Sequence, residues 1–137
     1  MSLFEFPNDD ILEGDIGQFT NLHAHSIFSP LDGFAKLDDY IQRAKKLGMK
    51  GVTFTDHGNM FGAYDLWKTC NKHGMKPIFG NETYIAPHSG LVKEKTEGYK
   101  PAYHCLLLAA SDVGYQNLMK ITSDSWTKYK YYKARTD

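Results

Sequence analysis

The sequence predicts an α/β fold with parallel strands, and two observations support this prediction. Short apolar runs alternate along the 137 residues with amphipathic helical patterns, in the order strand, helix, strand, helix, strand, loop, strand, helix. Strands separated by helices usually pair in parallel through right-handed crossovers. The apolar share of 42% and the formal net charge of zero fit an ordinary globular domain. They exclude a disordered chain and a strongly basic nucleic-acid-binding arm.

The first elements follow an acidic stretch over residues 1–18, which we interpret as a leader segment. A short strand is expected over 19–23. Apolar residues recur at helical spacing over 37–47, with acidic residues in the first turn and Gly48 just past the end. This pattern predicts an amphipathic helix. The apolar run over 51–55 predicts the next strand.

The remaining elements continue the alternation. We expect a second helix over 63–73 that ends at a glycine, and a third strand over 77–85. A long mobile loop with several glycines and prolines follows over 87–102. A fourth strand is expected over 104–109 and a third helix over 112–122.

The cellular compartment is inferred from the cysteines and from the absence of targeting signals. Cys70 and Cys105 lie in apolar segments of predicted helix and strand, so a disulfide is not expected. The N-terminal sequence has neither the basic start nor the cleavage site of a signal peptide. No apolar run approaches the roughly 20 residues of a membrane helix. We therefore predict a cytoplasmic protein without a membrane partner.

Imidazole and carboxylate side chains collect near the ends of the predicted strands, where α/β folds place their working residues. Two histidines two positions apart in an extended segment point to the same side of it. Mixed nitrogen and oxygen ligands suit zinc, manganese or iron. The six candidate metal ligands are His23, His25, Asp32, His57, Glu82 and His104.

Each candidate also has an ordinary structural interpretation. The His23/His25 pair could be half-buried strand histidines, and the residues around His57 could form an Asx turn. Glu82 could face solvent, and His104 could be a core histidine. Their coincidence at successive strand ends favours the metal site. His73, near a helix C-terminus, and His88, in the loop, are assigned no role in it.

Four ordered motifs resemble the polymerase and histidinol phosphatase (PHP) domain, in the form found at the N-terminus of bacterial DNA polymerase III alpha subunits. The resemblance covers residues 19–137. The motifs span residues 22–33, 55–63 and 76–82, followed by 104–109 together with 114–118.

The resemblance implies a distorted TIM-like β/α barrel, of which residues 19–137 would be the N-terminal half, incomplete at the C-terminus. A complete barrel needs about 250 residues. The six candidates match family ligand positions for divalent ions, zinc or manganese before iron, with roughly two or three ions in the complete domain. The implied chemistry is phosphoester hydrolysis, in polymerases a 3′–5′ exonuclease, with no catalytic residues beyond the ligands.

The resemblance also implies partners. The chain is predicted to be part of a replicative DNA polymerase III alpha subunit, inactive alone and completed by a second chain or a missing segment. It would contact DNA through the whole polymerase. An open half-barrel exposes strand edges and its inner face, so the isolated chain is expected to be poorly folded or oligomeric. The alternatives are a structural scaffold without catalysis and a stand-alone phosphatase.

Lysines alternate with aromatic residues over 126–135 near the C-terminus. Such a pattern can contact nucleic acid through phosphates and base stacking. It can also be a helix end whose aromatic rings pack on neighbours outside this chain. The zero net charge favours the second interpretation.

Overall fold

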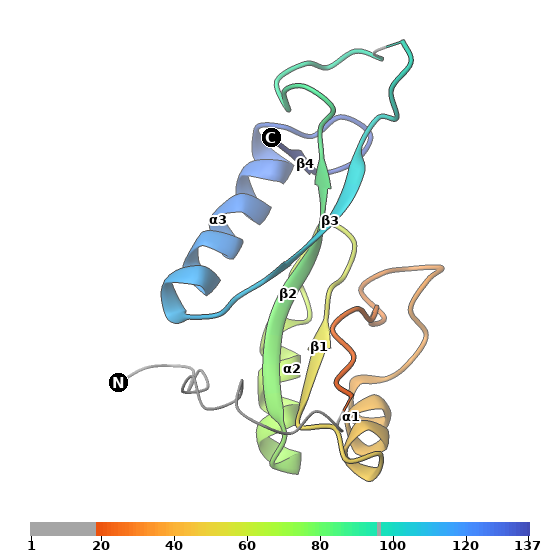
Figure 1. Ribbon diagram of the computed structural model, residues 1–137, viewed down its shortest axis with the longest axis vertical. Coiled ribbons are helices and arrows are strands. Elements are labelled where there is room, and N and C mark those ends of the chain that lie inside the picture. The colour runs from red at the N-terminus through yellow and green to blue at the C-terminus, as the bar shows by residue number, and fades with distance from the viewer. Residues whose placement is uncertain (1–18, 96) are drawn as a thin grey trace.

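The described part of the computed structural model, residues 19–95 and 97–137, forms three helices and a four-stranded mixed sheet (Figure 1). The predicted leader segment lies outside these residues. In chain order the elements are α1 (Leu37–Lys46), β1 (Gly51–Phe54), α2 (Ala63–His73), β2 (Lys76–Ile85), β3 (Tyr103–Leu108), α3 (Asp112–Thr127) and β4 (Arg135–Thr136).

The long strand β2 organises the sheet. Strand β1 pairs in parallel with its first part, from Gly51 opposite Lys76 to Phe54 opposite Phe79. Strand β3 runs antiparallel to its second part, and β4 pairs in parallel with its last two residues. Parallel pairing is therefore confirmed for β1 and wrong for β3. The described residues form an open sheet, not a closed barrel.

The orientation of β3 has a simple physical reason. A parallel connection needs a crossover of about a dozen residues, usually a helix, to return the chain to the starting edge. The loop between β2 and β3 contains no helix among its described residues. The chain therefore turns back at the end of β2, and β3 begins beside the residues where β2 finishes.

The strand predicted over 19–23 is not formed. This segment passes beside β1, where the backbone N–H of Thr55 donates to the carbonyl of Ala24 at 2.8 Å. It lacks the repeating ladder of hydrogen bonds that defines a strand. The consequence is that His23 and His25 lie on an irregular segment at the end of β1.

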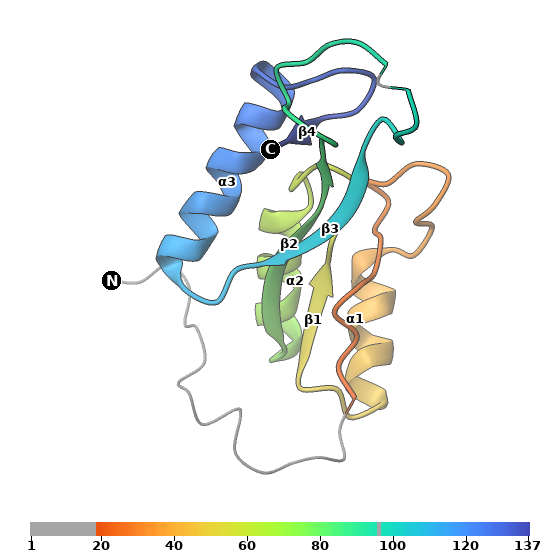
Figure 2. The same ribbon diagram turned by 45° about the horizontal axis from the view of Figure 1, so that its top comes forward.

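The helices cover one face of the sheet and build the core there (Figure 2). Ile41 of α1 and Leu66 of α2 are buried against Val52 and Phe54 of β1. Helix α2 ends where predicted, because Gly74 adopts the left-handed conformation (φ 63°). Helix α3 extends to Thr127, beyond the predicted end at 122, after the side chain of Ser111 caps its first turn.

Side chains alternate between the two faces along β2. The Asn81 side chain donates to the Thr122 hydroxyl of α3, on the helix side. The next residue, Glu82, contacts histidines on the opposite face. The face of the sheet away from the helices therefore carries the polar cluster described below.

No helix in the described residues is long and apolar enough to cross a membrane.

Candidate metal centre

A buried carboxylate holds the loop that follows His25. Both oxygens of Asp56 accept hydrogen bonds: Oδ1 from the Ser26 backbone N–H (2.8 Å) and the Ser29 hydroxyl (2.6 Å), and Oδ2 from the Ser26 hydroxyl (2.7 Å). The Ser29 hydroxyl also accepts from the backbone N–H of His57 at 3.1 Å. This network ties the loop to the end of β1. Asp56 itself therefore serves the site by positioning its neighbours.

The carboxylate of Glu82 lies at the centre of the candidate site. Its side chain is 3% exposed, and each of its oxygens faces two imidazoles. Oε2 lies 2.8 Å from Nε2 of His23 and 3.1 Å from Nε2 of His25. Oε1 lies 3.6 Å from Nδ1 of His57 and is also paired with Nδ1 of His104. A solvent-facing role for Glu82 is therefore wrong.

Asp32 closes the other side of the cluster. Its Oδ2 lies 2.6 Å from Nε2 of His57 and 3.8 Å from Nε2 of His25, whose rings stack with centroids 4.2 Å apart. The hydrogen bond from His57, with the nearby histidine charges, holds the pKa of Asp32 below its usual value despite partial desolvation. This carboxyl is therefore ready to act as an anionic ligand.

All six residues predicted from the sequence come together in three overlapping groups. His23, His25 and Glu82 form the first, His25, Asp32 and His57 the second, and His57, Glu82 and His104 the third. In each group, one ligand atom from every residue lies within 4.8 Å of the others. Because His25, His57 and Glu82 are each shared by two groups, the arrangement can hold more than one ion with bridging ligands.

The polar atoms left without partners fit a metal as well. Nδ1 of His25 and Nδ1 of His57 are buried and make no hydrogen bond among the described residues. Nδ1 of His57 faces Oε1 of Glu82 at 3.6 Å, too far for a hydrogen bond, and coordination to an ion would satisfy it. The donor set of imidazoles and carboxylates, with no thiolate, suits a divalent ion of the zinc or manganese type.

His104 reaches the cluster because β3 is antiparallel. A residue at the start of a parallel strand would lie at the opposite edge of the sheet from the ends of β1 and β2. Here His104 pairs with Tyr84, two residues after Glu82 along β2. His104, the first residue of the strand predicted over 104–109, thus meets the other candidates in space.

The histidines that we assigned no role lie elsewhere. His73, at the end of α2, contacts the Asp38 carboxylate of α1 at 2.9 Å. The ring of His88 packs edge-on against Tyr99 in the loop between β2 and β3. An Asx-type turn is also present after β1, where Oδ1 of Asn59 accepts from the backbone N–H of Phe61 at 3.2 Å. The stretch therefore contains both a candidate metal ligand, His57, and an Asx-type turn, at Asn59.

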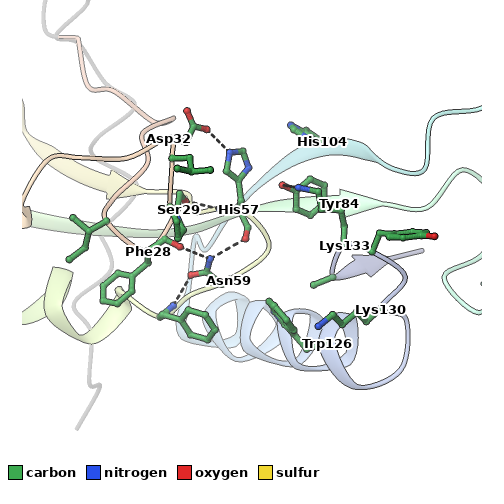
Figure 3. A pocket seen from close by; sticks show the side chains of 16 residues that line it. Phe28, Ser29, Asp32, His57, Asn59, Tyr84, His104, Trp126, Lys130 and Lys133 are labelled. Atoms are coloured by element: carbon green, nitrogen blue, oxygen red, sulfur yellow. Dashed lines mark hydrogen bonds and ion pairs between the residues drawn. The ribbon is translucent and has the colours of Figure 1, made fainter.

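A cavity of about 840 Å³ adjoins the cluster (Figure 3). Asp32, His57 and His104 line one part of it, and aromatic and lysine side chains from the C-terminal segment line another. Sequence reasoning assigned those C-terminal residues no part in the site, because nothing in their local pattern indicates that the chain returns to the cluster. The C-terminal lining residues are Trp126, Lys130, Tyr132, Lys133 and Ala134.

Comparisons with known proteins give one family and several longer relatives. A family model described as the PHP domain matches residues 21–137. The DNA polymerase III subunit alpha of Borreliella burgdorferi is 46% identical over 120 residues, and that of Treponema pallidum is 41% identical over 119 residues. These matches cover 88% and 87% of this chain and 10% of each relative. The chain thus spans about a tenth of the length of these relatives.

A solved structure shares the fold. A proposed metal-dependent phosphoesterase from Bifidobacterium adolescentis superposes with a TM-score of 0.51 at 21% identity, over 75% of this chain and 31% of that protein.

Proposed function

The chain belongs to the PHP domain family, and we propose that it supplies a metal-dependent phosphoester-hydrolysing centre to a DNA polymerase III alpha subunit. The observation that carries this proposal is the buried carboxylate of Glu82, whose two oxygens face four imidazoles from separate segments. A carboxylate that bridges two sets of nitrogen ligands is a common feature of multi-metal hydrolytic sites.

Different ligand residues would hold different ions, according to their position in the cluster. His23 and His25 would hold one ion with Oε2 of Glu82, and His57 and His104 a second with Oε1. Asp32, on a surface loop, would complete a third group with His25 and His57. When bound, divalent ions of this kind lower the pKa of a bound water and polarise a phosphoryl oxygen. Asp56 would keep His25 and Asp32 in place through the two serines that it binds.

Several features of the proposal come from the longer relatives. Bacterial DNA polymerase III alpha subunits are about ten times the length matched here, so a further segment or a second chain would complete the domain. This proposal includes replication of DNA in the cytoplasm and nucleotidyl transfer by the whole polymerase. It also includes 3′–5′ exonuclease activity, with zinc or manganese as the resident ions. In the isolated chain we expect metal binding and little hydrolysis.

The test is the metal content of the purified chain, measured by plasma mass spectrometry, with Glu82→Gln and the double variant His23→Ala/His25→Ala beside it. Glu82→Gln keeps the size of the side chain and removes the anionic bridge. We expect the wild type to retain zinc, manganese or iron near stoichiometry, and both variants to lose most of it.

His88→Ala is the matched control, because it removes an imidazole that lies outside the cluster. It should keep the metal content of the wild type. A wild-type chain that binds no metal when zinc or manganese is supplied would contradict the proposal. If metal is present and raises the melting temperature, but the completed polymerase shows no metal-dependent hydrolysis, the scaffold function would stand instead.

A further inference from the structure

The cavity beside the metal cluster has two chemically different walls (Figure 3). Candidate metal ligands form one wall, and the other combines aromatic rings with lysine ammonium groups. A nucleotide has the same two parts, a phosphate and a flat base. We infer that this cavity binds one nucleotide unit, with its phosphate between Lys133 and the cluster and its base against Trp126 and Phe61. This inference rests on the proposed function for the place of the phosphate.

The two lysines that line the cavity are available to an anion. Lys130 and Lys133 have no ion-pair partner among the described residues, whereas Lys128 in the same segment pairs with Asp124 at 2.9 Å. Lys130 Nζ lies 4.5 Å from the centre of the Trp126 ring, and Lys133 Nζ lies 5.0 Å from the centre of the Tyr84 ring. Lysines held by aromatic rings, without a carboxylate partner, can bind a phosphate without breaking an ion pair.

Tyr84 connects Lys133 with the cluster. Its ring stacks on His57 with centroids 6.0 Å apart and meets His104 edge-on at 4.8 Å. Its hydroxyl accepts a hydrogen bond from Lys133 at 3.5 Å. Lys133 therefore lies over a ring that itself touches two candidate metal ligands. A phosphate at this position would meet the ammonium group from one side and the cluster from the other.

The aromatic wall is fixed in orientation. The indole N–H of Trp126 donates to the carbonyl of Gly58 at 2.8 Å, which ties the end of α3 to the turn after His57. Trp126 is still 41% exposed, and the centroid of its ring lies 6.4 Å from the centroid of the Phe61 ring. A preoriented ring that remains accessible suits base stacking, which is tolerant of base identity.

Tyr132 adds a third aromatic group at the opening of the cavity. It is 83% exposed, and its backbone adopts a positive φ of 56°, a conformation that bulky residues rarely take. Backbone hydrogen bonds between Tyr131 and Lys133 on either side hold it there. Such conformations concentrate at binding sites. The segment thus presents Tyr132 and Lys133 to the same cavity.

These contacts revise the interpretation of residues 126–135. The zero net charge argues against a general nucleic-acid-binding surface, but it does not bear on a single site where the unpaired lysines gather. Trp126 is anchored within this chain, because its indole N–H donates to the Gly58 carbonyl.

The test is fluorescence anisotropy of the full chain with a 5′-labelled oligothymidylate of eight nucleotides, with manganese and again with a chelator. Lys133→Gln should weaken binding roughly tenfold and reduce the salt slope of the affinity by about 0.7, the value for one phosphate contact on a single strand. Trp126→Leu should weaken it about tenfold through lost stacking, and Trp126→Phe, which keeps a ring, by much less.

Lys128→Gln is the matched control, because it removes the same charge from the same segment outside the cavity. It should bind as the wild type does. Thymidine monophosphate should compete with the probe, and tighter binding of the oligomer than of the monophosphate would identify a strand end as the ligand. Equal affinities would identify a single nucleotide.

The inference fails if inorganic phosphate competes as well as thymidine monophosphate, or if Lys128→Gln and Lys133→Gln weaken binding equally. It also fails if the chain binds metal but not the probe, a result that leaves the proposed function intact. Binding that depends on Lys133 and Trp126 in a chain that takes up no metal would support the nucleotide site and refute the metal centre.

Discussion

Two halves of the sheet differ in how completely they are covered. All four residues of β1 are buried, whereas five of the six residues of β3 are exposed. Yet β3 makes the longer ladder with β2, from Gly80 opposite Leu108 to Ile85 opposite Tyr103. Backbone pairing and burial are therefore separate properties. A strand can pair with its neighbour along its whole length and still contribute little to the core.

The difference comes from what lies on each face. Strand β1 has α1 and α2 on one face and the segment around Ala24 along the edge that does not pair with β2 (Figures 1 and 2). Strand β3 places Leu107 against the core on the helix side and leaves Leu106 and Leu108 open on the other. The candidate metal centre lies at the boundary and takes His57 from the end of β1 and His104 from β3. Its ligands thus join the covered half to the open one.

The largest expected contrast is between two alanine substitutions, one of a buried residue in the covered half and one of an exposed residue in the open half. Ile41 is 0% exposed and Leu106 is 39% exposed. Ile41→Ala should lower the free energy of unfolding by about 2–5 kcal/mol, through lost burial and the cavity left behind. Leu106→Ala should cost less than about 1 kcal/mol. Urea denaturation of both variants measures the two values, and equal losses would contradict the comparison.

The next effect concerns the loop that covers the end of β1. Asp56→Asn replaces one carboxylate oxygen with a donor that faces groups which already donate to it. We expect a loss of about 1–3 kcal/mol in unfolding free energy and weaker metal binding, because His25 and Asp32 lose their support. Thermal melting and metal titration test this. The exposed Asp39→Asn is the control, and an equal effect there would rule out a specific role for Asp56.

The open half should also control self-association. Leu106 and Leu108 are each 39% exposed on the face away from the helices. The isolated chain should associate as its concentration rises, through this apolar face or the free edge of β3. Leu106→Lys/Leu108→Lys should shift the population toward monomer in sedimentation velocity. A wild-type chain that stays monomeric with a cooperative melt at high concentration would disprove the expectation.

The smallest effect is a pH dependence within the covered half. Hydrogen bonds from His73, Lys72 and Gln42 hold the pKa of Asp38 well below its usual value of 3.8. A carboxyl with a lowered folded-state pKa stabilises the fold above its unfolded-state pKa, and the contribution is lost as the pH falls through and below about 4. The Asp38 side chain is 40% exposed, so solvent screens the interaction and the effect should be small. Asp38→Asn should flatten the acid limb of stability against pH, and an unchanged limb would exclude this contribution.

Local patterns in the sequence predicted most of the elements. Helical periodicity and the glycine stop located α1 and α2 closely, and the apolar runs located β1, β2 and β3 within a few residues. The six candidate ligands were predicted because imidazoles and carboxylates lie in or near successive predicted strands, an order that is visible without coordinates. The strand expected over 19–23 failed because a short apolar run cannot show whether a full ladder will form beside it.

The direction of β3 and the return of the C-terminal segment were decided only by the tertiary structure. Whether a strand pairs parallel or antiparallel depends on where its connecting loop lets it return, and the loop over 87–102 carries no periodic signal for that. The same holds for Lys133, which meets Tyr84 at a separation of 49 residues. The sequence by itself determined most of the elements and the ligand types, because both depend on near neighbours. Packing between distant segments decided which side chains share a cavity.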